Sequence, residues 1–230
     1  MAESWDARVS AVAALDEPTR RRLYDFVVRQ PAPVSRDEAA AAVDLARTTA
    51  AFHLEKLAEE GLLEVVHERR TGRSGPGAGR PSKLYRRSAR QIAVSLPDRR
   101  YELVGDLLAA AVQEADGSGE SPRSVLARRA RELGQDIGES ARSADSGVDS
   151  RDTVLRALES YGFEPRARDA AIVLGNCPFH SLAKRHTELV CGMNVCLIDG
   201  LLRGLAVTDL TASLHPEPDH CCVRVEPAES

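Results

Sequence analysis

Apolar residues recur at helical spacing near the start of the chain. In DEPTRRRLYDFVV, the side chains of Leu23, Phe26 and Val27 share one face, and this pattern predicts a helix from about residue 17 to 29. The next segment, SRDEAAAAV, opens with a serine followed three residues later by a glutamate. This is a capping-box pattern, in which the two side chains satisfy amide groups at a helix start. It predicts a second, shorter helix.

A third helix is predicted for ARTTAAFHLEKLAEE, after a turn at Asp44 and Leu45. Its apolar face contains Ala50, Leu54 and Leu57. A glycine follows the helix, as is typical of a helix end. Two short strands, LLEVVHERR and SKLYRRS, then flank a segment rich in glycine and proline. Together these elements predict a helix-turn-helix followed by a two-stranded wing.

The rest of the chain predicts more helices and a few strands. Two helices are expected in PDRRYELVGDLLAAAVQEA and PRSVLARRARELGQDIGES, and a third in DTVLRALESYG. A strand pair is expected in FEPRARDAAIVLGNCPF, a long helix over 181–205 and a last strand in CCVRV. The fold class is therefore α+β, with an N-terminal winged helix-turn-helix domain, a helical connector and a C-terminal α+β sensor domain.

The breaks between these segments give the expected domain limits. We predict a DNA-binding domain over 1–93, a helical linker or dimerisation region over 94–145, and a cysteine-containing sensor domain over 146–230. The most apolar stretch, LVCGMNVCLIDGLLRGLAV, contains two charged residues and an asparagine, which is too polar for a membrane span. Since no signal peptide is recognised, we expect a cytoplasmic protein without a membrane partner.

Charge is divided unevenly along the chain. Residues 1–90 carry 16 Lys and Arg against 13 Asp and Glu, whereas residues 91–230 carry 15 against 22. Within the positive part, residues 69–90 hold eight basic residues and no acidic one. This concentration of positive charge indicates that the N-terminal part binds nucleic acid, with double-stranded DNA as the expected partner.

The third predicted helix is the candidate recognition helix. With its apolar face packed inward, Arg47, Thr48, Thr49 and Phe52 face outward near its start, where they can reach base edges or phosphates. Arg47 is the best candidate for reading a base. The alternative is that it contacts only phosphate, since at least half of such hydrogen bonds go to the DNA backbone.

The predicted wing supplies further DNA-binding candidates. Glycines in GPGAGRP allow a close approach of the backbone to DNA, and Arg73, Arg80 and Lys83 are placed to reach phosphates or the minor groove. The alternative is a solvated basic loop without a partner.

The order LDEPTRRRLYDFV, DLARTTAAFHLEKLAEEGLL and GRPSKLY resembles the winged-helix domain of ArsR-like bacterial transcriptional regulators, over roughly residues 8–90. The resemblance implies a transcriptional regulator and not an enzyme. A homodimer is expected, because paired recognition helices read two half-sites one DNA turn apart.

Five cysteines form the other candidate site. Because cytoplasmic thiols are kept reduced, they are expected to be free thiols or metal ligands, not disulfides. Cys177, Cys191 and Cys221 are widely spaced, without a Cys-x2-Cys pair, and converge only if the fold brings them together. Cys196 points away from Cys191 on the same helix and is expected to be buried. If Cys221 faces the core from the last strand, Cys222 is a spare or redox-exposed thiol.

The pattern NCPFHSLAKRHTELVCGMNVCLIDGLL followed by CCVRV resembles the sensor domain of Suf-type regulators, which are ArsR-like repressors of iron–sulfur-cluster assembly. The resemblance implies a repressor that senses iron–sulfur or redox status through a cluster on Cys177, Cys191 and Cys221. The gaps here are slightly longer than in that family. The fourth position is open, with His180, His186 or Cys222 as candidates, or a ligand from outside the protein.

Other interpretations of these residues stay open. Zinc suits the same set, because three cysteines and one histidine form an ordinary structural zinc site. The cysteines can also be packed thiols in a regulator that binds a small-molecule effector. A different class is an enzyme with Cys177 as nucleophile and His180 or His186 as base, but nothing in the sequence requires a substrate pocket.

Overall fold

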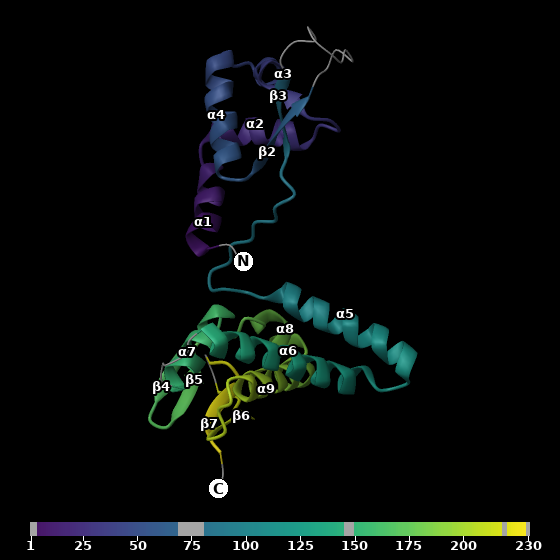
Figure 1. Cartoon of the computed structure of the whole chain (residues 1–230), viewed down its shortest axis with the longest axis vertical. Coiled ribbons are helices and arrows are strands. Elements are labelled where there is room, and N and C mark those ends of the chain that lie inside the picture. The colour runs from purple at the N-terminus through teal and green to yellow at the C-terminus, as the bar shows by residue number, and fades with distance from the viewer. Residues whose placement is uncertain (1–3, 69–80, 145–149, 218–219, 229–230) are drawn as a thin grey trace. The chain divides into compact units, whose positions relative to one another are not determined.

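The structure of the protein is a computed structural model, and it describes residues 4–68, 81–144, 150–217 and 220–228. The chain divides into two compact units, Met1–Val94 and Ser95–Ser230 (Figure 1). Each unit has its own apolar core. The fold is mixed helix and sheet, as the sequence predicts, with a winged helix-turn-helix first and an α+β region after it.

The first unit contains four helices and a small sheet within its described residues. Its elements are α1 (Trp5–Ala14), α2 (Pro18–Val28), β1 (Val34–Ser35), α3 (Arg36–Ala42), α4 (Arg47–Glu59), β2 (Leu63–Glu68) and β3 (Ser82–Arg87). The antiparallel sheet has the order β1-β3-β2, so β3 lies in the middle. The helices α3 and α4 form the helix-turn-helix, and β2 with β3 forms the wing.

Local signals in the sequence set the helix limits of this unit. Ser35 and Glu38 form the predicted capping box at the start of α3, with each side chain bonded to the other's backbone. Asp44, in the turn between α3 and α4, has a φ of 54°, a left-handed conformation that aspartate tolerates better than most residues. Gly61 has a φ of 70° directly after α4. The end of this helix therefore agrees with its prediction.

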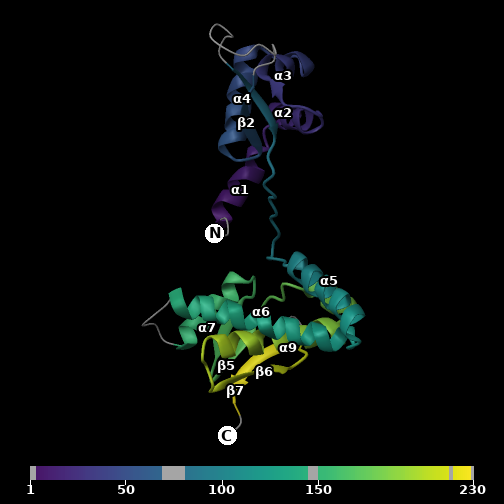
Figure 2. The same cartoon turned by 45° about the vertical axis from the view of Figure 1, so that its right-hand side comes forward.

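The second unit consists of helices packed on one four-stranded antiparallel sheet (Figure 2). Its elements are α5 (Tyr101–Ser118), α6 (Pro122–Ala144), α7 (Ser150–Ser160), β4 (Pro165–Arg168), β5 (Ala171–Leu174), α8 (His180–Arg185), α9 (Thr187–Gly204), β6 (Leu210–Leu214) and β7 (Val223–Pro227). The strand order is β4-β5-β7-β6. Since α9 packs against β6 and β7 and also against α6, it lies between the sheet and the other helices.

The two central helices, α6 and α9, approach each other closely. A Cβ atom added at Gly134 of α6 would collide with the backbone oxygen of Leu197, and one added at Gly200 of α9 would collide with that of Arg131. Only glycine leaves room for two helix backbones at this distance. The packing fixes α9, and with it Cys191, relative to α6.

Four features of the structure differ from the expected elements. Helix α1, the short strand β1 and strand β6 were not predicted. The long helix expected over 181–205 is two helices, because the backbone at His186 is not helical (φ −135°, ψ 54°). No residue of α8 is buried, whereas most of the apolar residues of α9 are. The break lets the apolar helix enter the core while the polar one stays at the surface.

Candidate functional site

Helix α4 presents the predicted recognition surface at its first turn. Arg47, Thr48 and Thr49 are exposed, and Phe52 keeps 68% of its surface accessible. On the opposite face, the side chains predicted to pack inward, Ala50, Leu54 and Leu57, are fully buried. Such an exposed phenyl ring costs free energy in water unless a partner covers it. The helix is therefore oriented with its polar start and one large apolar side chain toward solvent.

Asp37 of α3 forms an ion pair with Arg47, the first residue of α4. The guanidinium of Arg47 donates to both carboxylate oxygens of Asp37, at 2.6 and 2.8 Å. Both side chains are more than half exposed, so the pair contributes little to stability. It orients the guanidinium across the helix-turn-helix, where a DNA phosphate or a guanine edge can displace the carboxylate.

In the wing, one of the three predicted contact residues lies in the described part of the chain. Lys83 stands near the start of β3, and its ammonium donates to the carboxylate of Glu55 on α4, at 2.5 and 2.6 Å. Arg73 and Arg80 lie outside the described residues. The structure thus connects the wing strand to the recognition helix through Glu55, a residue that the helical spacing places on the outward face without indicating this contact.

Glu55 also accepts a hydrogen bond of 2.7 Å from the hydroxyl of Tyr85 on β3. The hydrogen bond from Lys83 lowers the pKa of Glu55, so this carboxylate stays ionised at neutral pH. Burial and the nearby carboxylate raise the pKa of Tyr85 above its usual range. A glutamate at helical spacing gives no local signal of this contact, which depends on the packing of β3 against α4.

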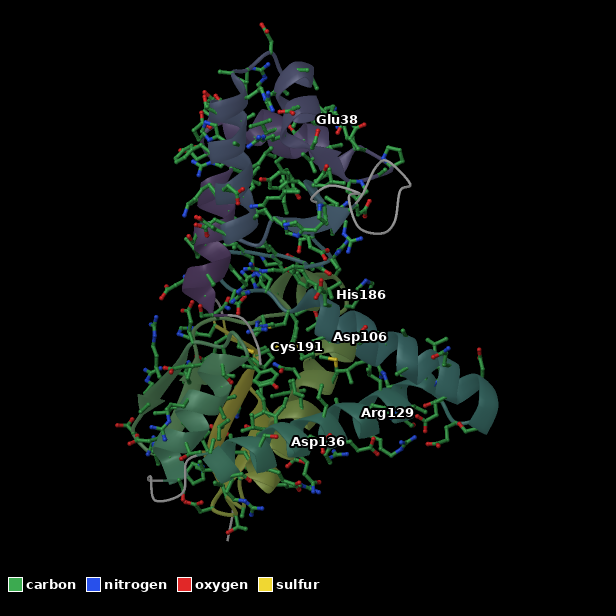
Figure 3. All side chains as sticks on the ribbon, turned by 45° about the horizontal axis from the view of Figure 1, so that its top comes forward. Glu38, Asp106, Arg129, Asp136, His186 and Cys191 are labelled. Atoms are coloured by element: carbon green, nitrogen blue, oxygen red, sulfur yellow. A yellow bond between two sulfur atoms is a disulfide. The ribbon has the colours of Figure 1, made fainter. Side chains whose placement is uncertain are left out.

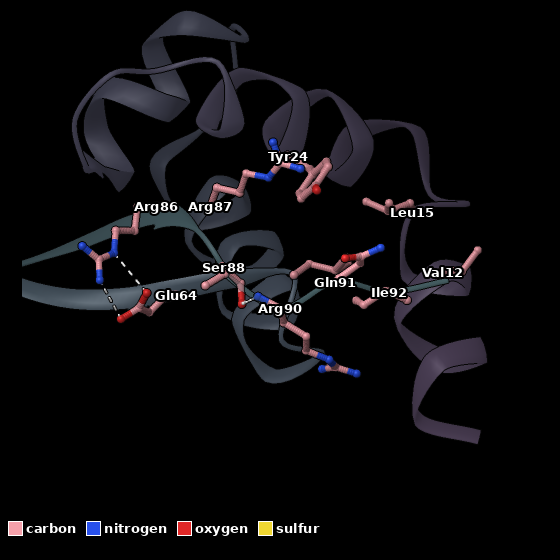
Figure 4. Close-up of a pocket in the computed structure, with 12 residues that line it drawn as sticks. Val12, Leu15, Tyr24, Glu64, Arg86, Arg87, Ser88, Arg90, Gln91 and Ile92 are labelled. Atoms are coloured by element: carbon pink, nitrogen blue, oxygen red, sulfur yellow. Dashed lines mark hydrogen bonds and ion pairs between the residues drawn. The ribbon is translucent and has the colours of Figure 1, made fainter. Parts of the chain in front are cut away.

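A cavity of about 870 Å³ lies at the base of the wing, within the first unit (Figure 4). It is lined by residues of α1 and α2, by the ion pair between Arg86 and Glu64, and by the segment after β3. No local pattern in the sequence indicates this cavity, because its walls come from segments far apart in the chain.

In the second unit, the structure joins Cys191 and Cys222 in a disulfide bond, with their Cα atoms 6.6 Å apart. The expectation that all five cysteines are free thiols or ligands is therefore wrong for this pair, and Cys222 is not a spare thiol. The bond forms because α9 lies directly against the segment that enters β7. The three cysteines outside the bond are Cys177, Cys196 and Cys221.

Cys177 and Cys221 form a second sulfur pair, and both are buried. The thiol of Cys221 donates a hydrogen bond to the sulfur of Cys177, which lowers the pKa of Cys177, with a further contribution from the positive charge of Arg99. The same hydrogen bond, together with burial, raises the pKa of Cys221 far above its usual range. The first proton to leave this pair therefore comes from Cys177.

The two sulfur pairs are connected through adjacent residues and through α9. Cys221 and Cys222 are successive residues, and Asn194, one turn after Cys191 on α9, places its amide nitrogen 3.5 Å from the sulfur of Cys221. The side-chain oxygen of Asn194 is buried and has no hydrogen-bond partner among the described residues. A buried acceptor without a partner is costly, so this position points to an additional ligand or proton donor.

The predicted histidines lie at the surface. His180 begins α8 and His186 separates α8 from α9, and both are exposed, whereas Cys177, Cys191 and Cys221 are buried. Figure 3 labels His186 and Cys191 of these residues. Cys196 is half-buried, not buried as expected, and lies 3.5 Å from the guanidinium of Arg131. Among the residues that the structure describes, no group of three or more His, Cys, Asp or Glu side chains is arranged to hold a metal ion.

Comparison with known proteins bears on the first unit. Residues 15–66 match a helix-turn-helix domain family. The match spans α2, α3, α4 and the start of the wing. It supports the assignment of a helix-turn-helix domain to the N-terminal unit, and helix-turn-helix domains bind DNA. No curated protein and no solved structure matches the chain. No helix within the described residues is long and apolar enough to cross a membrane.

Proposed function

We propose that this protein is a transcriptional regulator that reads double-stranded DNA with α4 and the wing, and that its C-terminal unit senses iron–sulfur or redox status through its cysteines. The observation that carries the DNA-binding part is the exposed start of α4 within a matched helix-turn-helix domain. The proposal also includes a homodimer, a role as repressor and an iron–sulfur cluster.

At the DNA, the side chains of α4 divide between bases and phosphates. Arg47 has the length and the two parallel donors for a guanine edge in the major groove. Thr48 and Thr49 are placed for phosphate or base contacts, and the exposed ring of Phe52 suits the methyl group of thymine. Lys83, Arg73 and Arg80 of the wing supply positive charge for phosphates or the minor groove.

The sensing part of the proposal rests on the chemistry of the cysteine site. Cys177 and Cys221 form one buried sulfur pair, Cys222 follows Cys221 in the chain and is bonded to Cys191, and the amide of Asn194 contacts the sulfur of Cys221. In the reduced form, thiolates brought together here would favour a soft cation, which suits an iron–sulfur cluster or zinc. The proposed ligands are Cys177, Cys191 and Cys221. Cys222 is favoured as the fourth over His180 and His186, because it already adjoins the site and both histidines are exposed.

A bound cluster would supply sensitivity to oxidants and to iron and sulfide availability. The protein's own residues would carry the response. Helix α9 bears Cys191 and packs tightly on α6, so a change at the sulfur site alters the position of α9 and α6 together. Coupling to DNA requires that the two states of the site favour different arrangements of the dimer.

DNA recognition can be tested before the operator sequence is known. Binding sites are selected from a pool of randomised duplexes, and affinities are then measured by fluorescence anisotropy. Arg47→Ala should lose discrimination at particular base pairs, by about 1–3 kcal/mol each. Arg80→Ala should weaken binding on all sequences and reduce the salt dependence by about one phosphate contact. Equal losses on every sequence for both variants would contradict the assignment of Arg47 as a base reader.

The sensing part is tested by anaerobic purification, an absorption spectrum, and iron, sulfide and zinc analysis. The wild type should be brown, with sulfur-to-iron bands that disappear in Cys177→Ser, Cys191→Ser and Cys221→Ser. A colourless protein with stoichiometric zinc would replace the cluster by a zinc site. A metal-free protein that still binds DNA would remove the metal from the proposal and favour a small-molecule effector.

A further inference from the structure

We propose that Cys191 and Cys222 form a reversible disulfide that closes the cysteine site to metal, so that the oxidised bond and a bound soft cation are mutually exclusive states of the protein. The inference deepens the proposed function and rests on its sensing part. It adds a second signal to which the site would respond. This signal is the redox state of the thiols, and it needs no bound metal.

The exclusion follows from the ligand chemistry of sulfur. A metal ion binds the thiolate form of cysteine, and two sulfurs joined in a disulfide carry no negative charge. With the bond in place, Cys177 and Cys221 are the only thiols left at the site in the described part of the chain, because Cys196 points away along α9. Two thiolates are too few for the usual four-coordinate sites of soft cations.

The position of the disulfide couples the two sulfur pairs. Its two cysteines come from α9 and from the residue directly after Cys221, so reduction releases two more thiols beside the existing pair. Of these sulfurs, that of Cys221 contacts the amide of Asn194 on α9, the helix that also carries Cys191. We expect reduction to supply the two further thiolates that the ligand set requires.

The unpartnered oxygen of Asn194 supports the presence of a second state. Asn194 is 1% exposed, and its side-chain oxygen lacks a donor among the described residues. Cys191 lies three residues earlier on the same face of α9, but its disulfide sulfur has no proton to donate. In the reduced protein a Cys191 thiol, or a ligand bound between the sulfurs, can satisfy this oxygen. The disulfide state thus leaves a cost that the reduced state, with a thiol at Cys191, removes.

The exchange step is ordinary thiol–disulfide chemistry with a low-molecular-weight dithiol as reductant. One thiolate of the reductant attacks the sulfur of Cys222, which is the partly exposed member of the pair, and Cys191 leaves as a thiolate. The second thiolate of the reductant attacks the mixed disulfide, releases Cys222 and becomes a cyclic disulfide. Two electrons pass from the reductant to the protein, and water or buffer supplies protons to the released thiolates. A low-molecular-weight disulfide oxidises the two cysteines to the bond again by the same steps in reverse.

The bond itself is tested on the full-length protein without metal. Protein treated with oxidised glutathione is denatured, alkylated and analysed by peptide mass spectrometry, before and after reduction with a dithiol. Cys177, Cys196 and Cys221 should be alkylated in both samples, and Cys191 and Cys222 only after reduction. Alkylation of Cys191 and Cys222 in the oxidised sample would overturn the proposal.

The exclusion is tested with Co²⁺ as a spectroscopic probe, in which thiolate ligation gives an intense near-ultraviolet band. Reduced protein should take up one Co²⁺ with this band, and oxidised protein should bind more than about tenfold more weakly. Cys222→Ser lacks both the bond and the proposed fourth ligand, so it should bind Co²⁺ more weakly than the reduced wild type, and the oxidant should cause no further loss. Cys196→Ser is the matched control and should behave like the wild type in both forms.

The outcomes separate this inference from the proposed function. Equal Co²⁺ binding by oxidised and reduced protein would overturn the exclusion and leave a metal site intact. Absence of Co²⁺ binding in both forms would overturn the exclusion and the metal part of the proposed function together. The DNA-binding measurements do not depend on either result, since they concern the first unit.

Discussion

Glu55 lies where the recognition helix meets the wing, and its carboxylate accepts hydrogen bonds from Lys83 and Tyr85. The contact has two opposite effects. It fixes the wing strand against α4, which favours binding by ordering the surface in advance. It also occupies the ammonium of Lys83 and places a negative charge beside the DNA-binding surface. Since both charged side chains are more than a third exposed, their contribution to folding is small.

We therefore expect the electrostatic effect of Glu55 to dominate in DNA binding. Glu55→Gln keeps the shape of the side chain and an acceptor for Tyr85, but it removes the charge and releases Lys83. Affinity for any duplex should rise several-fold, and the slope of log affinity against log salt should become steeper by up to about one unit. Anisotropy titrations from low to moderate salt measure both quantities.

Glu59→Gln is the matched control for this prediction, because it removes the same charge from the last turn of α4. Glu59 is paired only loosely, at 3.7 Å from Lys56, and does not contact the wing in the described structure. It should change affinity less and leave the salt slope almost unaltered. A Glu55→Gln protein that binds DNA more weakly than wild type would show that ordering of the wing is the larger effect.

For single residues, the local sequence pattern predicts which side chains are buried but not which residues they contact or bond. The spacing of Ala50, Leu54 and Leu57 was sufficient to assign their face to the core, and all three are fully buried. The disulfide partner of Cys222 was not predictable in the same way. Alternation along a strand placed this residue opposite Cys221, but β7 begins only at Val223, so the rule for strands does not govern it. Its partner is 31 residues away in sequence.

The packing of the second unit depends on the close contact between α6 and α9. A helix pair usually leaves room for side chains between its backbones, with axes roughly 8–10 Å apart. Here glycines on both helices, among them Gly134 and Gly200, let the two backbones come closer together. The cysteine site depends on this contact, because α9 carries Cys191 and Asn194.

Gly134→Ala should consequently destabilise the second unit. The added methyl group has no space beside the backbone oxygen of Leu197, so the helices must separate. Overpacking of this kind costs about 1–3 kcal/mol or more. Urea unfolding followed by circular dichroism measures the loss. The variant should also form the Cys191–Cys222 bond less completely, which alkylation mass spectrometry can quantify.

Gly105→Ala on α5 is the control, because nothing lies within 4 Å of a Cβ added there. This substitution should be neutral or stabilise the protein by up to about 1 kcal/mol, since alanine favours a helix over glycine. An equal loss of stability in both variants would contradict the argument from helix contact.

The sequence predicted most elements of both units, because caps and apolar spacing are local properties. The capping box at Ser35 and the apolar face of α4 are examples. What it could not predict were features set by packing. Strand β1 is two residues long and pairs with Tyr85 and Leu84 of a distant strand, and the helix break at His186 reflects where the core begins. Neither feature has a local signature.

At the scale of the whole molecule, the two units carry opposite net charge. The described division between Val94 and Ser95 coincides with the change from the basic to the acidic part of the chain. A positive unit associates with DNA through released counterions, and a negative unit is repelled from it. This division of charge agrees with DNA contact by the first unit.

The proposed homodimer makes a specific prediction about operator geometry. Two recognition helices related by two-fold symmetry read half-sites about one helical turn apart, roughly 10–10.5 base pairs between centres. An insertion of five base pairs between the half-sites turns one of them to the opposite face of the duplex. Affinity should then fall by more than about tenfold, whereas single half-sites should each bind weakly.

An insertion of ten base pairs is the informative control, because it restores the rotational phase and changes only the distance. Partial recovery of affinity would indicate that phase matters most, as expected if the connection between recognition helices can extend. Sedimentation velocity of the free protein and of the complex gives the number of chains, which should be two per duplex. Identical affinity at every spacing, with one chain bound for each half-site, would contradict the dimer, because independent chains have no reason to distinguish the faces of the helix.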